Sequence, residues 1–262
     1  MRIMMAGDTH SNFEQWEYLF PIAKDLNVDV IMQLGDFGYW AHTKGGLNHL
    51  DALHDLAVEY DIPIYWLDGN HENHVHLRVN RIAVWNMFCL MAGVDPGPFV
   101  PIRGTHIVHT PRGATWEWDG VKFLAVGGAF SIDRGWRDVG ESFWFEEELT
   151  DAEADYASRV GKVDVLVSHD VPMGTDMAYM FIRQGRSYRP IPQAEPNRRR
   201  LRQVVEATKP NYIYHGHYHI CYKNYLELNS GHTIVVMGLG ADGMEQDSWT
   251  ILDTEDLTNP VG

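Results

Sequence analysis

The chain of 262 residues contains few cysteines and no long apolar run. Its two cysteines, Cys89 and Cys221, cannot build a disulfide framework or a cysteine-rich zinc site, and free thiols in a reducing cytosol are the simpler interpretation. No run of about 18 apolar residues is present, so we expect no transmembrane helix. Asp8 interrupts the N-terminal apolar run before the core of a signal peptide could form. We therefore expect a cytoplasmic protein with no membrane partner.

Basic residues are also scarce. There are 21 of them against 36 acidic residues, which gives a formal net charge of −15. A chain this acidic repels polyanions over most of its surface, so an extended nucleic-acid coating is not expected.

The basic residues that do occur are unevenly placed. Seven arginines and one glutamate fall in residues 183–202, so this segment carries +6 and the remainder −21. The arginines are Arg183, Arg186, Arg189, Arg198, Arg199, Arg200 and Arg202. One interpretation is a solvated loop and helix face. The other is a rim that binds substrate phosphates, because the guanidinium group binds phosphate through two parallel hydrogen bonds.

The order of predicted elements indicates the fold class. Buried strands at 2–6, 29–34 and 62–67 alternate with helices through 11–27 and 47–60. Ser11 and Glu14 fit a capping box at the start of the first helix, and Pro21 could kink it. This β-α-β-α-β alternation predicts an α/β domain with a partly parallel sheet.

The second half predicts further short elements. Asp119–Gly120 is typical of a hairpin turn, and Thr150 with Glu153 forms a second capping box, which opens a helix to about residue 160. Residues 171–197 are rich in Pro, Gly and Arg, and we predict a long surface excursion there. The remaining expected elements are a helix at 198–208 and strands at 105–109, 115–118, 121–126, 163–168, 212–214, 221–228, 232–237 and 248–252. Residues 238–243 match G-x-G-x-x-G, but another strand follows, so we interpret them as a turn. With no repeat or linker, we predict one domain over 1–262, built of two packed sheets flanked by helices.

Histidine, with 14 residues, is abundant, and it is the commonest metal ligand. Five polar segments stand where predicted strands end: Gly7-Asp8-Thr9-His10, Gly35-Asp36, Gly69-Asn70-His71-Glu72, Ser168-His169-Asp170 and Gly216-His217-Tyr218-His219. Sites in α/β sheets form outside the carboxyl ends of the strands, so the five segments could converge in one cleft. The glycines would let the backbone turn sharply and approach the site.

The residue types in these segments suit divalent metals. Two carboxylates, one amide oxygen and four imidazoles, with no thiolate, favour Mn, Fe, Zn, Ni or Co over Mg or Ca. Seven ligands are too many for one tetrahedral ion, and they suffice for two ions that share a bridging carboxylate. Two such ions stabilise the attacking and leaving oxygens of an in-line displacement.

The five motifs, in this order, resemble the calcineurin-like metallophosphoesterase superfamily, and they spread from Asp8 to His219. The resemblance implies a four-layer αββα sandwich of two mixed β-sheets flanked by helices, with two divalent metal ions. The most favoured metal is Mn, with Fe, Zn, Ni and Co as alternatives.

The resemblance also implies a role for each residue. Asp8, His10 and His219 would bind the first metal, and Asp36 would bridge both. The second metal would be bound by Asn70, His169 and His217. A hydroxide bridging the metals would be the nucleophile, and His71 would donate a proton to the leaving oxygen. The expected reaction is hydrolysis of phosphodiester or phosphomonoester bonds in a phosphorylated small molecule, a nucleotide or a nucleic-acid end.

The second motif departs from one branch of the superfamily. Protein Ser/Thr phosphatases carry G-D-x-x-D-R-G, whereas Tyr39 and Trp40 stand here in place of that Asp and Arg. This argues against a protein phosphatase of that type and leaves the orienting partner of His71 open. A protein phosphatase of unusual type and a non-catalytic scaffold on the same fold remain alternatives. The sequence singles out no definite substrate-binding residue: Tyr39 and Trp40 could stack a nucleobase, and the loop 127–137 is a further candidate for substrate contact.

Overall fold

Strand β1 (Arg2–Ala6) sends alternate side chains to opposite faces of its sheet, and this alternation sets the layers of the fold. In the computed structural model, which describes residues 1–257, Ile3 and Met5 pack in a core between two β-sheets. Met4 and Ala6 point the other way, into a second core beneath two helices. Both faces of β1 are therefore buried, which explains its continuous run of apolar residues.

Each of the two sheets has six strands. The first has the order β12 (Trp249–Asp253), β1, β2 (Val30–Gln33), β3 (Ile64–Trp66), β5 (Ile107–His109) and β4 (Val100–Arg103). The second has the order β10 (Tyr222–Glu227), β11 (Thr233–Gly238), β9 (Tyr212–His215), β8 (Val165–Ser168), β7 (Val121–Val126) and β6 (Thr115–Trp118). The inner strands pair in parallel, and β12, β4, β10 and β6 pair antiparallel at the edges, so both sheets are mixed.

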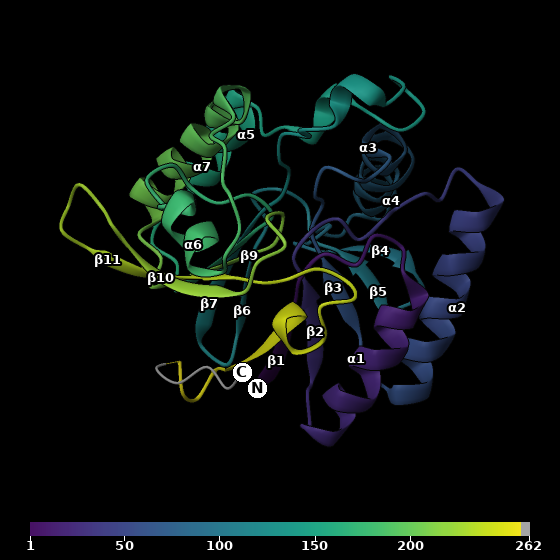
Figure 1. Cartoon of the computed structure of the whole chain (residues 1–262). Coiled ribbons are helices and arrows are strands. Elements are labelled where there is room, and N and C mark those ends of the chain that lie inside the picture. Colours follow the sequence, from purple (N-terminus) through teal and green to yellow (C-terminus); the bar gives the residue numbers. More distant parts are fainter. Residues whose placement is uncertain (258–262) are drawn as a thin grey trace.

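Helices cover the outer face of each sheet. The first sheet is covered by α1 (Phe13–Asp25) and α2 (Lys44–Tyr60), and the second by α5 (Asp151–Ser158), α6 (Met177–Arg183) and α7 (Glu195–Thr208) (Figure 1). The prediction of two mixed sheets in a four-layer αββα sandwich is therefore confirmed. The single-domain boundary of 1–262 stays a prediction, and its last five residues lie outside the described part of the chain.

The start of α1 differs from the prediction. Asn12, not Ser11, is the N-cap, and its side chain accepts a hydrogen bond of 3.1 Å from the Glu14 amide. Ser11 instead adopts a left-handed φ of 59°, and its hydroxyl donates to the carbonyl of Gly38 at 2.7 Å. Pro21 lies inside α1 without ending it. The capping box of Thr150 and the hairpin turn at Asp119–Gly120 are confirmed.

The loop predicted at residues 171–197 is shorter than expected, because one helix and the start of another lie within it. Helix α6 lies within the expected surface excursion and buries Met177 and Met180 against the second sheet, and α7 begins at Glu195 rather than residue 198. Short 3₁₀ turns occupy Arg134–Trp136, Phe145–Glu147, Pro192–Ala194 and Glu245–Ser248. The last of these follows residues 238–243 and leads directly into β12, so no βαβ unit forms there.

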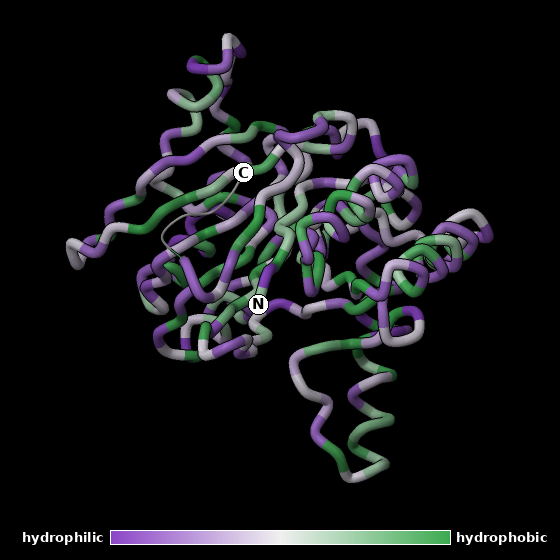
Figure 2. Tube along the Cα trace, turned by 90° about the horizontal axis from the view of Figure 1, so that it is seen from below, coloured by the Kyte–Doolittle hydropathy of each residue, from purple (hydrophilic) through white to green (hydrophobic). Residues whose placement is uncertain are grey.

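The sequence prediction missed a helical arm after the third motif. It comprises α3 (His74–Leu77), the π-helical turn η1 (Arg78–Ile82) and α4 (Ala83–Ala92), and it projects from the body of the molecule (Figure 2). Helix α4 has no charged residue, and it buries only Cys89 while Leu90 and Met91 are 79% and 82% exposed. Within residues 1–257, none of the helices has the length and apolar character to span a membrane.

Candidate metal centre and active site

Five strand ends from the two sheets meet at one site. Asp8, Asp36 and Asn70 follow β1, β2 and β3 of the first sheet. His169 follows β8 directly, and the segment with His217 and His219 follows β9 of the second sheet. Strands β1, β2 and β3 pair in parallel, and so do β8 and β9. Within each sheet, the carboxyl ends of these strands therefore lie at the same edge.

Two clusters of side chains result. In the first, ligand atoms of Asp8, His10 and His219 lie within 4.8 Å of one another, and His219 Nε2 is 2.9 Å from Asp8 Oδ2. In the second, the same limit holds for Asp36, His169 and His217. The first cluster contains the three ligands inferred for the first metal, and the second contains His169 and His217, inferred for the second metal, together with Asp36.

Asp36 belongs to the second cluster and also borders the first. Its Oδ2 lies 3.5 Å from His10 Nε2, and its Oδ1 lies 3.3 Å from His169 Nε2. Its Oδ1 also accepts hydrogen bonds of 2.7 Å from the amides of Asn70 and His71. The Asn70 side-chain oxygen in turn lies 3.1 Å from His169 Nε2. This is the position that a bridging carboxylate requires.

The charges of these groups indicate a cation site. Burial alone lowers the pKa of His169, but the carboxylates of Asp36 and Asp8 overcome it and raise the pKa to about 10. Burial likewise opposes the charged form of His10, and hydrogen bonding to Asp36 raises its pKa to about 10. Without a metal, buried carboxylates are thus balanced by protonated imidazoles. A divalent cation would replace those protons, because metal binding releases protons from its ligands.

The outer nitrogens of two histidines have partners that leave the inner nitrogens facing the clusters. His10 Nδ1 lies 2.7 Å from Asp242 Oδ1, and His169 Nδ1 lies 2.8 Å from the carbonyl of Leu34. Carboxylate or carbonyl partners of this kind are the usual way of orienting metal-binding histidines. The donor set and its orientation therefore fit divalent metal ions.

Asp242 was not predicted from the sequence. It lies in the turn after β11, its amide donates to the Asp8 carbonyl at 2.8 Å, and Ala241 forms a bridge with Asp8. The only sequence signal was its place in the G-x-G-x-x-G segment, which gives no indication of a contact with Asp8.

Two glycines permit the close packing at the site. A Cβ atom on Gly69 would overlap the amide and carboxylate of Asp36, and one on Gly216 would overlap the carboxylate of Asp8.

Glu72, fully buried, accepts hydrogen bonds from the amides of Gly38 and Gly69 at 3.1 and 2.7 Å. Burial and the Asp36 charge raise its pKa to about 8. Glu72 therefore supports the loops of the second and third motifs.

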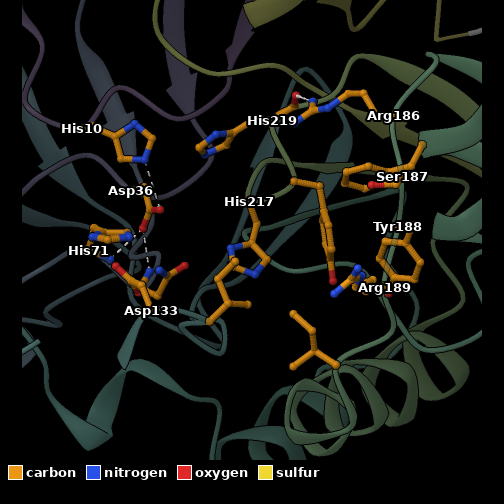
Figure 3. A pocket seen from close by; sticks show the side chains of 15 residues that line it. His10, Asp36, His71, Asp133, Arg186, Ser187, Tyr188, Arg189, His217 and His219 are labelled. Carbon is orange, nitrogen blue, oxygen red and sulfur yellow. Dashed lines mark hydrogen bonds and ion pairs between the residues drawn. The ribbon is translucent and has the colours of Figure 1, made fainter. Parts of the chain in front are cut away.

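His71 lies beside the clusters, with its ring 5.7 Å from the ring of His10 in an edge-to-face arrangement. Burial lowers its pKa. In the described part of the chain no group holds its imidazole by a hydrogen bond, so the structure supplies no orienting partner. The ring faces the same space as His10 and Asp36 (Figure 3).

A cavity of about 580 Å³ lies in front of the clusters. Six of the eight residues singled out from the sequence line it: His10, Asp36, Asn70, His71, His217 and His219. Asp8 and His169 lie behind them and are almost fully buried. The rest of the lining consists of Ile132 and Asp133 of the loop 127–137, residues of the segment 181–191, and Tyr218.

The proposed nucleobase platform at Tyr39 and Trp40 was wrong for Tyr39. Its side chain is fully buried, its ring stacks on Trp66, and its hydroxyl lies 3.0 Å from His76 Nδ1. Trp40 packs against Trp144 at 5.6 Å between ring centroids and does not line the cavity.

Arg137, whose side chain is only 9% exposed, supports the third motif. Arg137 donates to the Asn70 carbonyl at 3.2 Å and to the Ser131 hydroxyl at 2.6 Å. The Ser131 hydroxyl also accepts from the Asn70 side chain at 3.0 Å and donates to Glu147 at 2.8 Å. The loop 127–137 thus contributes a support for Asn70 as well as part of the cavity lining.

Known proteins resemble this chain in sequence pattern and in fold. The family described as calcineurin-like phosphoesterase matches residues 1–221. The crystal structure of TT1561 of Thermus thermophilus has a TM-score of 0.53 at 14% identity, covering 96% of this chain and 93% of that one. A structure described as a novel archaeal phosphodiesterase has a TM-score of 0.44 at 13% identity, and the match covers 100% of this chain and 99% of that one. No curated protein matches the sequence. Since the family match spans most of the chain and all five motifs meet at one site, the chain belongs to the calcineurin-like phosphoesterase family of metal-dependent phosphate-ester hydrolases.

Proposed function

We propose that this protein hydrolyses phosphodiester or phosphomonoester bonds of nucleotides or nucleic-acid ends, using two divalent metal ions. Asp8, His10 and His219 would hold one ion, Asn70, His169 and His217 would hold the other, and Asp36 would contribute to both. The single observation that carries the proposal is the pair of adjacent clusters, joined through the contact of Asp36 with His10, at the floor of one cavity.

When bound, two such ions supply Lewis acidity and an activated water. The chain's own residues do the rest. The Leu34 carbonyl orients the ring of His169, and Asp242 orients the ring of His10. Glu72 holds the loops of the second and third motifs together through the amides of Gly38 and Gly69. His71 faces the cavity and donates a proton to the leaving oxygen. The low pKa of His217, about 4 because of its burial and the nearby His169, keeps its imidazole neutral and able to bind metal.

We propose Mn as the native metal, with Fe, Zn, Ni and Co as the alternatives. The nitrogen-rich character of the donor set disfavours Mg and Ca, which prefer oxygen ligands. The substrate we propose is a phosphorylated small molecule, a nucleotide or the end of a nucleic acid. An extended nucleic-acid duplex is not proposed, since the net charge is −15.

The experiment is a hydrolysis assay on protein stripped of metal by a chelator and reloaded with each metal in turn. The substrates are p-nitrophenyl phosphate, bis(p-nitrophenyl) phosphate, a 2′,3′-cyclic nucleotide and a phosphopeptide. We expect metal-dependent hydrolysis, greatest with Mn. Asp36→Asn should lower kcat by more than about 100-fold, since even outer partners of metal ligands contribute 10- to 100-fold.

Asp36→Asn is chosen because asparagine tolerates the left-handed φ of 53° at this position. The matched control is Asp55→Asn, the same change on an 86%-exposed side chain of α2, and it should leave the rate unchanged. An Asp36→Asn protein with full activity would refute the assignment. Absence of hydrolysis with every metal would favour a scaffold, and a strong preference for phosphopeptides would favour a protein phosphatase.

A further inference from the structure

One wall of the cavity has a composition that the metal clusters do not explain. This wall, which we call the 181–191 wall, consists of Phe181, Arg186, Ser187, Tyr188, Arg189 and Ile191. It runs from the end of α6 into the loop before α7, and its labelled side chains face His10, Asp36 and His71 across the cavity (Figure 3).

The structure separates the arginines of the charged segment 183–202 into two groups. The arginines of α7 are bonded within the protein: Arg198 to the carbonyls of Val171 and Thr175, Arg199 to Glu195, Arg200 to Asp151 and Arg202 to Glu206. Arg183 lies over Tyr179 and does not line the cavity. Only Arg186 and Arg189 reach the cavity, so the segment is neither wholly a solvated face nor wholly a phosphate rim.

The two cavity arginines differ in their contacts. Arg186 donates a hydrogen bond of 2.7 Å to the His219 carbonyl, and its guanidinium group lies 5.2 Å from the centre of the Phe181 ring. Arg186 therefore attaches the wall to the site. Arg189 has no hydrogen bond, ion pair or ring contact with the described residues, although it lines the cavity of a strongly acidic protein. Its five N–H donors are available to a ligand.

Aromatic rings surround the arginines. The Phe181 ring lies 5.2 Å from that of Tyr188 and 6.3 Å from that of Tyr218, which is next to His217. The Tyr218 hydroxyl is held by Asp170 at 3.0 Å, so this ring is fixed in place. Rings beside arginines are the usual means by which proteins hold unpaired nucleotides, because bases stack on the rings and phosphates pair with guanidinium groups. The cavity of about 580 Å³ is of a size that holds small molecules.

We infer that the 181–191 wall selects a nucleotide substrate with two phosphates, in which Arg189 binds the phosphate that is not cleaved and the ring of Tyr188 packs against a base. This inference rests on the proposed function, since the cleaved ester must lie at the clusters. The substrate class is a short oligonucleotide or dinucleotide with a terminal phosphate. A simple alkyl phosphate would leave both Arg189 and the aromatic rings without a partner.

The test compares the dinucleotide TpT with pTpT and TpTp, which carry an additional 5′ or 3′ phosphate. With Mn present, kcat/KM should be about 10- to 100-fold higher for one of the phosphorylated forms, as one charge-assisted contact of Arg provides. In Arg189→Gln, the ratio of kcat/KM between the preferred phosphorylated form and TpT should fall close to one, mainly through a change in KM. Arg189→Lys should retain part of the preference, because the positive charge remains but the planar guanidinium group is lost.

Arg183→Gln is the matched control. It makes the same change in the same segment outside the cavity, and it should preserve the preference. Tyr188→Ala should reduce kcat/KM for pTpT more than for an abasic analogue with the same phosphates. Tyr188→Phe, which keeps the ring, should retain the discrimination between pTpT and the abasic analogue.

The two proposals fail in different ways. If the wild-type protein hydrolyses none of these esters with any metal, the proposed function fails. If it hydrolyses TpT, pTpT and TpTp at equal kcat/KM, or if Arg189→Gln keeps the preference, the inference about the wall is overturned and the proposed function stands.

Discussion

Removing the guanidinium group of Arg112 should destabilise the fold more than almost any other single charge removal. All three of its nitrogens are engaged: they donate to Asp68, to Glu153 and to the backbone carbonyls of residues 146, 147 and 148. The side chains of Arg112 and Asp68 are each about 5% exposed, with an Nη2–Oδ2 distance of 2.7 Å. Arg112 thus connects the residue before Gly69 to the loop before α5.

The expected loss in Arg112→Met is roughly 3–5 kcal/mol of unfolding free energy, because removing one partner leaves a buried charge uncompensated. This is a large part of the roughly 5–15 kcal/mol of a typical domain. Urea unfolding followed by circular dichroism measures the loss, and Arg112→Lys provides a milder variant that keeps a charge.

The pH dependence gives a second measurement. In the wild-type protein burial raises the pKa of Asp68, but Arg112, together with His74, His109 and Arg78, more than offsets burial and holds that pKa below its usual value. The stabilisation from Asp68 is therefore present above an unfolded pKa of about 3.9 and is lost as pH falls through the lower folded value. In Arg112→Met, the burial of Asp68 is no longer offset by Arg112, so the pKa of Asp68 in the folded protein rises. The loss of unfolding free energy in this variant therefore grows as pH increases.

The difference in unfolding free energy between wild type and Arg112→Met should accordingly be greater at pH 7 than at pH 4, by at least about 1.4 kcal/mol, the equivalent of one pKa unit. The double variant Asp68→Asn/Arg112→Met should recover part of the loss and show little pH dependence. A loss below about 1 kcal/mol at pH 7, or an equal loss at both pH values, would refute the reasoning.

Three further outcomes are expected. Asp242→Ala should lower kcat about 10- to 100-fold by releasing the His10 ring, with little change in unfolding free energy; unchanged kinetics would mean that the Asp242 contact does not matter. Treatment with a chelator should lower the unfolding temperature, and Mn at 100 times its Kd should restore about 2.7 kcal/mol; a calorimetric scan unaffected by the metal would contradict this. On the arm, Leu90→Gln should change unfolding free energy by no more than about 0.5 kcal/mol, since the side chain is 79% exposed; a larger loss in urea titration would indicate a packing partner.

The sequence predicted the parts of this fold that local patterns determine. The strands that carry the motifs are short apolar runs ending in Gly, Asp, Asn or His, and their order along the chain was enough to expect a common site. Thr150 and Glu153 satisfied a capping box because both partners lie within four residues. Ser11 and Glu14 have the same spacing, but the Ser11 hydroxyl bonds to Gly38, a residue 27 positions away.

What remained hidden depends on contacts between distant segments. Asp242 reaches His10 across 232 positions, and Arg112 reaches Asp68 across 44, so neither could be inferred from spacing. The division of the arginines at 183–202 also depends on which of them meet acidic partners elsewhere, such as Asp151. Helix α4 escaped prediction for another reason: its apolar residues surround the helix, so it lacks the one-sided pattern that identifies a helix packed on a core.

The left-handed backbone at the site restricts how its chemistry can be altered by mutation. His10, Asp36, His217 and His219 have φ values of 46°, 53°, 70° and 50°. Most side chains cost roughly 1–2 kcal/mol in this conformation, and Gly, Asn, Asp and His cost less. A library that replaces these four residues with Glu, Gln or Cys would therefore contain many variants that fail through folding rather than through metal preference. Asn70 and His169 have ordinary φ values, so a search for variants with a different metal should begin there.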